Sequence, residues 1–148
     1  MRLRRIRAGE LLALGGAICV IVSLVEPWYQ TPSGNLDAWS TFGPAVVLLI
    51  LAASAALVLF AATLTERSTA LPVAAAVWTV LLGLTAVIAA VVRLLERPDH
   101  ASALCAGAWL ALVGAVAILL GAWQSMRDER TSLYEPSKPP PQTPPPGA

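Results

Sequence analysis

Long stretches without charge constrain this chain more than any other feature of its sequence. Charged residues are absent from positions 38–65, 68–92 and 101–126, and Glu10 is the only one at positions 8–25. A helix rises about 1.5 Å per residue, so about 20 apolar residues cross the roughly 30 Å hydrocarbon core of a bilayer. We therefore predict four transmembrane helices, at about 8–25, 43–64, 71–95 and 101–123.

A soluble helical domain is the main alternative, but the helices lack the separate polar and apolar faces that such a domain needs. A helix on a soluble domain needs a polar stripe that repeats every 3.6 residues. The run "PAVVLLILAASAALVLFAATL" has no such stripe. Apolar residues make up 57% of the chain and charged residues 13%, against about 45–50% and about 25% in soluble domains. We expect an all-α, up-down four-helix transmembrane bundle within residues 1–125.

The first apolar run also resembles a secretory signal peptide, because it follows the basic start "MRLRRIR". No small-x-small cleavage site follows the run, and Ile18 stands where a lipoprotein signal needs a small residue before Cys19. We predict that this segment is retained, with cleavage as the alternative.

Arginine and lysine set the predicted orientation, since loops on the cytoplasmic side carry the excess of them. Four arginines precede the first span, Arg67 lies between the second and third, and three basic residues follow the fourth. We expect a multi-pass protein of the cell membrane with both termini in the cytoplasm. The loops at 26–42 and 96–100 then face outward.

Polar residues mark the expected helix boundaries. Ser40 or Thr41 can cap the second helix, Thr69 the third and Asp99 the fourth. The polar and proline-rich segment 126–148 cannot build a core and is predicted to be a disordered cytoplasmic tail. This tail is either a spacer or a docking peptide for a cytoplasmic partner.

The outer loop carries aromatic residues at both of its ends. Trp28 and Tyr29 follow the first span, and Trp39 and Phe42 precede the second. Such side chains favour the headgroup level, where a ring and a polar group are both satisfied. The loop is either an interfacial anchor or a binding lip for a lipid, a sugar polymer or a partner protein.

Trp78 and Trp109 lie within the third and fourth predicted spans. They fill the bundle core, face lipid, or enclose a pocket for a hydrophobic ligand. Small residues suit close helix contact, either within the bundle or between copies of the chain. They recur along the fourth span at Ala103, Gly107, Ala111, Ala115, Gly114, Ala117 and Gly121.

Few residues of the spans carry chemistry. Glu10 and Arg7 are three residues apart and can form an interfacial ion pair; a proton-coupled role for Glu10, as in small multidrug transporters, is the alternative. Cys19 and Cys105 are either buried thiols or a disulfide. Without a C-x-x-C pair, redox catalysis is not expected.

The charged residues at the outer ends of the spans do not suggest a catalytic site either. Arg93 and Glu96 form a solvated or paired rim, or contact the acids of the outer loop. His100 is the only histidine and is expected at the water boundary. We expect neither a cofactor nor a metal site.

Several short motifs resemble a group of small four-span membrane proteins from high-GC Gram-positive bacteria. They are "RAGE" at 7–10, "EPWY" at 26–29, "AWSTFG" at 38–43, "RLLERP" at 93–98 and "GAWLALVGAVAILLGAWQSMRDE" at 107–129. The similarity covers most of residues 5–130. It implies the four-span topology and supplies no catalytic residues, because the group has no assigned activity.

Taken together, these features favour a non-enzymatic membrane protein, an accessory or scaffold subunit that uses the outer loop and the tail. The alternative is a small oligomeric transporter or a protein that binds lipid or another hydrophobic ligand. The expected partners are the lipid bilayer, a membrane protein or a second copy, and a cytoplasmic protein at the tail. Nucleic acid is not expected.

Overall fold

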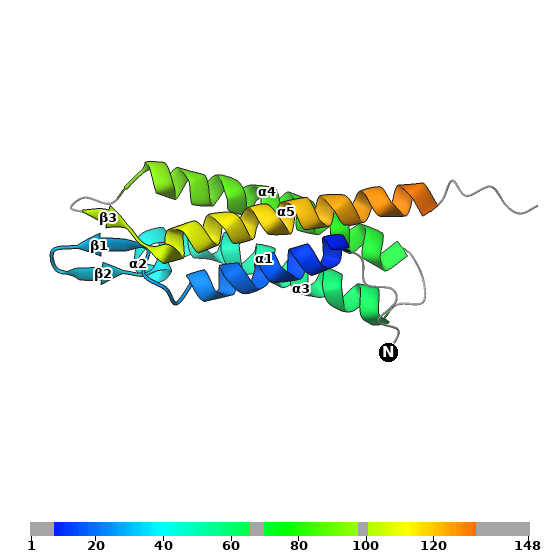
Figure 1. Cartoon of the computed structure of the whole chain (residues 1–148), viewed down its shortest axis with the longest axis horizontal. Coiled ribbons are helices and arrows are strands. Elements are labelled where there is room, and N and C mark those ends of the chain that lie inside the picture. The colour runs from blue at the N-terminus through cyan, green and yellow to red at the C-terminus, as the bar shows by residue number, and fades with distance from the viewer. Residues whose placement is uncertain (1–7, 66–69, 98–100, 133–148) are drawn as a thin grey trace, which may run out of the picture.

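The computed structural model describes residues 8–65, 70–97 and 101–132, and within them four long helices form an antiparallel bundle (Figure 1). They are α1 (Ala8–Ser23), α3 (Val46–Thr65), α4 (Ala70–Leu95) and α5 (Ala106–Ser132). A small sheet covers one end of the bundle, called the sheet end below; Ala8 and Ser132 lie toward the other, called the terminal end. The predicted helical bundle is therefore confirmed.

The helices pack in a closed ring, in which α1 and α4 each lie between α3 and α5. The contact between α1 and α5 is the most extensive, and glycines make it close. A Cβ atom added at Gly16 would lie 2.6 Å from the Gly114 carbonyl oxygen, and one at Gly121 would lie 2.5 Å from the Ala13 nitrogen. The small residues of the last helix thus pack within the bundle.

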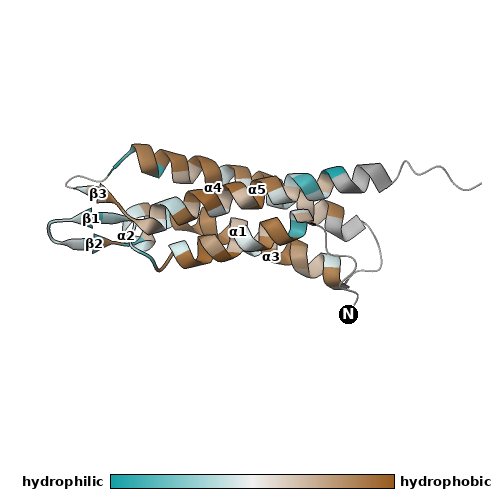
Figure 2. Ribbon diagram, in the orientation of Figure 1, coloured by the Kyte–Doolittle hydropathy of each residue, from teal (hydrophilic) through white to brown (hydrophobic). Residues whose placement is uncertain are grey.

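The distribution of side-chain size is inverted relative to a soluble domain. Most of the buried apolar residues are alanines, whereas many leucines, isoleucines, valines and tryptophans are exposed on the bundle surface. Figure 2 shows that hydrophobic residues follow the helices along most of their length. Three helical segments, Ala38–Leu64, Val73–Leu95 and Ala106–Arg127, are long and apolar enough to cross a membrane. The first helix, Ala8–Ser23, is apolar but shorter.

A three-stranded antiparallel sheet forms the sheet end of the fold and was missed by the all-α expectation. Its strands are β1 (Tyr29–Thr31), β2 (Gly34–Leu36) and β3 (Ala103–Leu104), in the order β2-β1-β3. Tyr29 pairs with Leu36 on one side and with Leu104 on the other. The sheet pairs backbone groups in the segments between the helices.

Pairing of the third strand corrects the predicted start of the last helix. The main-chain N–H groups of Ser102 and Cys105 donate to the carbonyls of Gln30 and Trp28, both at 2.9 Å. These bonds hold the chain extended, so α5 begins at Ala106 and not at residue 101. At its other end α5 continues to Ser132, past residue 125 where we expected the helical domain to end.

The second helix, predicted at about 43–64, corresponds to α3 with one turn before it, and a further short helix lies in the segment 26–42 that we expected to be a loop. A short helix, α2 (Ala38–Phe42), and a 3₁₀ turn, η2 (Gly43–Ala45), precede α3. The cap of α2 is Asp37, not Ser40 or Thr41, because the Asp37 carboxylate accepts the Ser40 N–H at 2.9 Å. The expected roles of Arg7, Thr69, Asp99, His100 and the tail from residue 133 onward lie outside the described residues.

Candidate functional site at the sheet end

Trp28 fixes the sheet to the bundle. Its side chain is fully buried, and its indole N–H donates to the Ser23 carbonyl oxygen at 2.7 Å. The ring meets Phe42 edge-on, with centroids 4.5 Å apart and planes at 87°. Aromatic pairs favour this geometry. One side chain therefore joins the end of α1, the loop after it and the end of α2.

Tyr29 makes the second connection. It is fully buried, and its hydroxyl donates to the main-chain carbonyl of Arg93, in the last turn of α4. Carbonyls in the last turn of a helix lack a partner within the helix, so the phenol supplies one. Burial raises the pKa of Tyr29, while the positive charges of Arg93 and Arg97 partly oppose this rise. The hydroxyl consequently remains a donor at neutral pH.

Arg93 contributes its side chain as well as its carbonyl. The guanidinium carbon lies over the Phe42 ring, 5.7 Å from the centroid. A cation over the face of an aromatic ring at this distance is attracted by the ring quadrupole. Trp28, Phe42 and Arg93 thus form a continuous row of contacts at the sheet end, which we call the stack although the two rings meet edge-on, and this row orients the arginine.

A groove of about 390 Å³ opens beside this stack, between the start of α3 and the sheet-end half of α4. Its floor and walls are mostly apolar, whereas Arg93 and Glu96 line it at the sheet end. The full lining is Phe42, Ala45, Leu48, Thr85, Ile88, Ala89, Val92, Arg93 and Glu96. The α4 members fall at spacings of three and four residues, which places them on one helix face.

Of the four aromatic residues predicted as a binding lip, three are structural. Trp28, Tyr29 and Phe42 are buried in the contacts described above, whereas Trp39 is 54% exposed. Beside Trp39, hydrogen bonds from the Ser40 hydroxyl and N–H lower the pKa of Asp37. The surface available to another molecule at the sheet end therefore includes Trp39, but not the other three rings.

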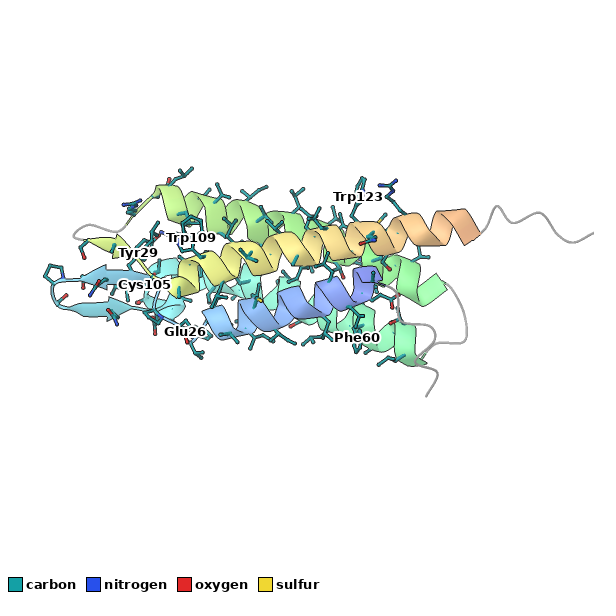
Figure 3. All side chains as sticks on the ribbon, viewed as in Figure 1. Glu26, Tyr29, Phe60, Cys105, Trp109 and Trp123 are labelled. Atoms are coloured by element: carbon teal, nitrogen blue, oxygen red, sulfur yellow. The ribbon has the colours of Figure 1, made fainter. Side chains whose placement is uncertain are left out.

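Trp78 and Trp109 point outward and lie at different depths. They are 64% and 54% exposed, and Figure 3 shows Trp109 in the sheet-end part of α5. Gly83 of α4 packs on Leu119 of α5. Trp78 lies five residues from that contact toward the terminal end, and Trp109 lies ten residues from it toward the sheet end. At about 1.5 Å per residue, the two tryptophans are about 22 Å apart along the bundle. At this separation the two rings do not face each other across one pocket.

Trp123 instead lies level with Trp78. It is four residues from Leu119 toward the terminal end and is also 54% exposed. The four exposed tryptophans therefore fall into two groups, with Trp39 and Trp109 toward the sheet end and Trp78 and Trp123 toward the terminal end. Sequence analysis had not grouped them, because their depth depends on how α4 and α5 align.

Glu10 and the two cysteines lie apart from the groove. Glu10 is buried, 4% exposed, in the first turn of α1 at the terminal end. Cys19 and Cys105 are both free and partly exposed thiols. Cys105 follows β3 at the sheet end (Figure 3).

Sequence reasoning missed the role of Arg93 toward Phe42 and Tyr29, although it had singled out Arg93 and Glu96 as a charged rim. The i, i+3, i+4 repeat from Thr85 to Glu96 was a signal for a common face. This repeat does not show that the opposite wall of the groove comes from residues 42–48.

Within residues 8–65, 70–97 and 101–132, no group of three or more His, Cys, Asp or Glu side chains could hold a metal ion. The resemblance to small four-span membrane proteins stays a prediction. No protein-family model, no curated protein and no solved structure matches this chain.

Proposed function

We propose that this chain is a multi-pass integral protein of the cell membrane, with the sheet end outside and both termini in the cytoplasm. The outward-facing leucines, valines and isoleucines of the bundle support this, because a large exposed apolar surface needs a lipid or protein partner. Alanines and glycines inside, where helices approach closely, are typical of helix packing in membranes.

The two groups of exposed tryptophans support the same placement. Tryptophan is enriched at both membrane–water interfaces. Trp109 and Trp123 are 14 residues apart on α5, which is about 21 Å along a helix. From these positions their rings can extend toward the two headgroup regions, which lie on either side of a core about 30 Å thick, with Trp39 and Trp78 at matching ends. The arginines near the N-terminus and Arg127 favour the terminal end as the cytoplasmic one.

The role that the geometry supports best is that of a non-enzymatic accessory or scaffold subunit with a preformed contact surface outside the membrane. One observation carries this proposal: the sheet is tied to three helices through Trp28, Tyr29 and Phe42. A surface that is already ordered binds a partner without the entropy cost of ordering it. Mere interfacial anchoring would not require this fixed arrangement.

Two features are free to make such a contact. Trp39 is exposed beside the sheet, and aromatic residues are enriched in protein interfaces. The strand β2 lies at one edge of the sheet, and an edge strand presents backbone groups that a partner can pair with. The cytoplasmic tail would supply a second contact.

Photo-crosslinking in native membranes tests the proposal. A photoreactive residue at Asn35, on the exposed hairpin, should give a discrete protein adduct. The same residue at Trp78, which is equally exposed but near the other membrane face, should give lipid adducts. A probe in place of buried Trp28, which should detach the sheet, shows which adducts a disordered sheet end gives. Lipid adducts alone at both exposed sites would exclude a partner at the sheet end.

The groove favours a second candidate function, binding of a lipid or another hydrophobic ligand. The transporter alternative, with Glu10 in a proton-coupled role, is tested separately by uptake into liposomes. Uptake that depends on pH and is lost in Glu10→Gln would support it. Uptake that is unchanged in Glu10→Gln would remove this residue from the mechanism.

A further inference from the structure

We propose that the groove between α3 and α4 binds one phospholipid whose headgroup carries a phosphate and a primary ammonium, as in phosphatidylethanolamine. This inference rests on the proposed membrane placement and names the ligand class for the second candidate function. It does not depend on the protein partner of the sheet.

The shape of the groove suits part of a lipid. Its volume of about 390 Å³ lies within the range of ligand pockets, about 300–1,000 Å³. Thr85 of α4 and Glu96, the residue after the end of α4, are 11 residues apart, so the groove runs about 16 Å along the bundle. Ala45, Leu48, Ile88, Ala89 and Val92 give it an apolar lining. This length takes the first part of an acyl chain, with the headgroup at the sheet end.

The charges at the sheet end of the groove suit a zwitterion. Arg93 supplies a guanidinium, which binds phosphate through two parallel hydrogen bonds. Glu96, the residue that follows the end of α4, supplies a carboxylate that can accept from an ammonium group. In the part of the chain that the structure describes, neither side chain makes an ion pair. The positive charge of Arg93 is thus available to a phosphate, and the negative charge of Glu96 to an ammonium group of the same ligand.

The arginine is also held in position before any ligand binds. Phe42 lies under its guanidinium, and the Tyr29 hydroxyl holds the carbonyl of the same residue. Such fixation lowers the entropy cost of binding a headgroup. The stack that ties the sheet to the bundle therefore also shapes the charged end of the groove.

Native mass spectrometry of the full chain in detergent micelles, after removal of lipid, tests this assignment with two added probes. The probes are dioleoyl phosphatidylethanolamine and dioleoyl phosphatidylglycerol, which share acyl chains and differ in the ammonium group. We expect tighter binding of phosphatidylethanolamine. Removing one partly exposed charge-assisted hydrogen bond should weaken binding about tenfold.

Charge variants locate the headgroup. Glu96→Gln should abolish the preference for phosphatidylethanolamine over phosphatidylglycerol, while Arg93→Gln should weaken the binding of both. Arg97→Gln is the matched control, since Arg97 is exposed nearby but does not line the groove. Equal effects of Arg97→Gln and Arg93→Gln would overturn the assignment, because they would indicate general surface attraction.

Shape variants locate the acyl chain. Ile88 lines the groove and is exposed, so Ile88→Trp should fill it without disturbing the core. Leu84 is exposed on the same helix but outside the groove, so Leu84→Trp should leave binding unchanged. Identical binding by both variants, or occupation of the groove by a second copy of the chain, would overturn the proposal.

These outcomes separate this inference from the proposed function. A chain that is inserted in the membrane but binds both lipids equally in every variant contradicts only the lipid assignment. A chain that stays dissolved without detergent contradicts both.

Discussion

The hydroxyl of Tyr29 hydrogen-bonds the main-chain carbonyl of Arg93, a residue 64 positions later in the sequence. The bond joins the first strand of the sheet to the last turn of α4. It occurs at the point where the Arg93 side chain leaves the helix toward Phe42. The segment after the first helix is therefore attached to the bundle and is not a free loop.

Titration of Tyr29 tests this attachment. Its pKa is raised above the ordinary value of 10.0, chiefly by burial. A raised pKa in the folded state stabilises the fold fully below pH 10, and that stability is lost as pH rises through the folded-state pKa. In a Tyr134→Phe background, ultraviolet difference absorbance should report one tyrosine that titrates above 10. Titration at the ordinary value would mean that the phenol is exposed.

Substitutions of Trp28 should detach the sheet. Trp28→Ala removes a buried aromatic ring and should cost about 3–5 kcal/mol, whereas Trp28→Phe should cost less. Trp39→Ala is the matched control, because that ring is already exposed. Hydrogen exchange of residues 27–37, followed by mass spectrometry, should rise strongly in the first variant only. Similar exchange in Trp28→Ala and Trp39→Ala would contradict the structural role of Trp28.

Two adjacent glycines of α1 should respond differently to alanine. A Cβ atom at Gly16 would meet main-chain atoms of α5 at 2.6 and 2.7 Å, while one at Gly15 would meet nothing within 4 Å. Gly16→Ala should therefore force α1 and α5 apart at a cost of about 1–3 kcal/mol. Gly15→Ala should be neutral or stabilise the helix by up to about 1 kcal/mol. Thermal unfolding in detergent micelles distinguishes them, and equal destabilisation would argue against this helix pairing.

Acid should loosen the short helix α2. Hydrogen bonds from Ser40 lower the pKa of Asp37 below its ordinary value of 3.8. A lowered pKa in the folded state gives stability that is present above the ordinary pKa and lost as pH falls through the folded-state value. The protection of the Ser40 amide, measured as its hydrogen-exchange rate relative to the intrinsic rate at each pH, should then fall in acid. Asp37→Asn keeps an acceptor without the charge, so the acid dependence should disappear; its persistence would exclude Asp37 as the cap.

The bundle could be predicted from the sequence because it depends on local properties. The charge-free lengths gave four apolar helices, and their short connections gave the antiparallel order. The α4 helix was placed to within one residue of its start. These features depend on residues close together in the chain.

The sheet and the groove could not be predicted, because each combines distant segments. Strand β3 has two residues and pairs with β1 more than 70 positions earlier. The burial of Trp28 and Phe42 depends on the same association, and so the sequence favoured interfacial rings at both positions. The depth of Trp78 likewise depends on the alignment of Gly83 with Leu119.

The central claim is that this bundle crosses a membrane with its sheet end outside the cell and its terminal end in the cytoplasm. Cysteine labelling tests it most directly, in a Cys19→Ala, Cys105→Ala background with one new thiol at Asn35 or at Arg127, both exposed positions. A membrane-impermeant maleimide should label Asn35→Cys in intact cells and Arg127→Cys only after permeabilisation. Labelling of Arg127→Cys in intact cells, or of neither site before permeabilisation, would contradict the account.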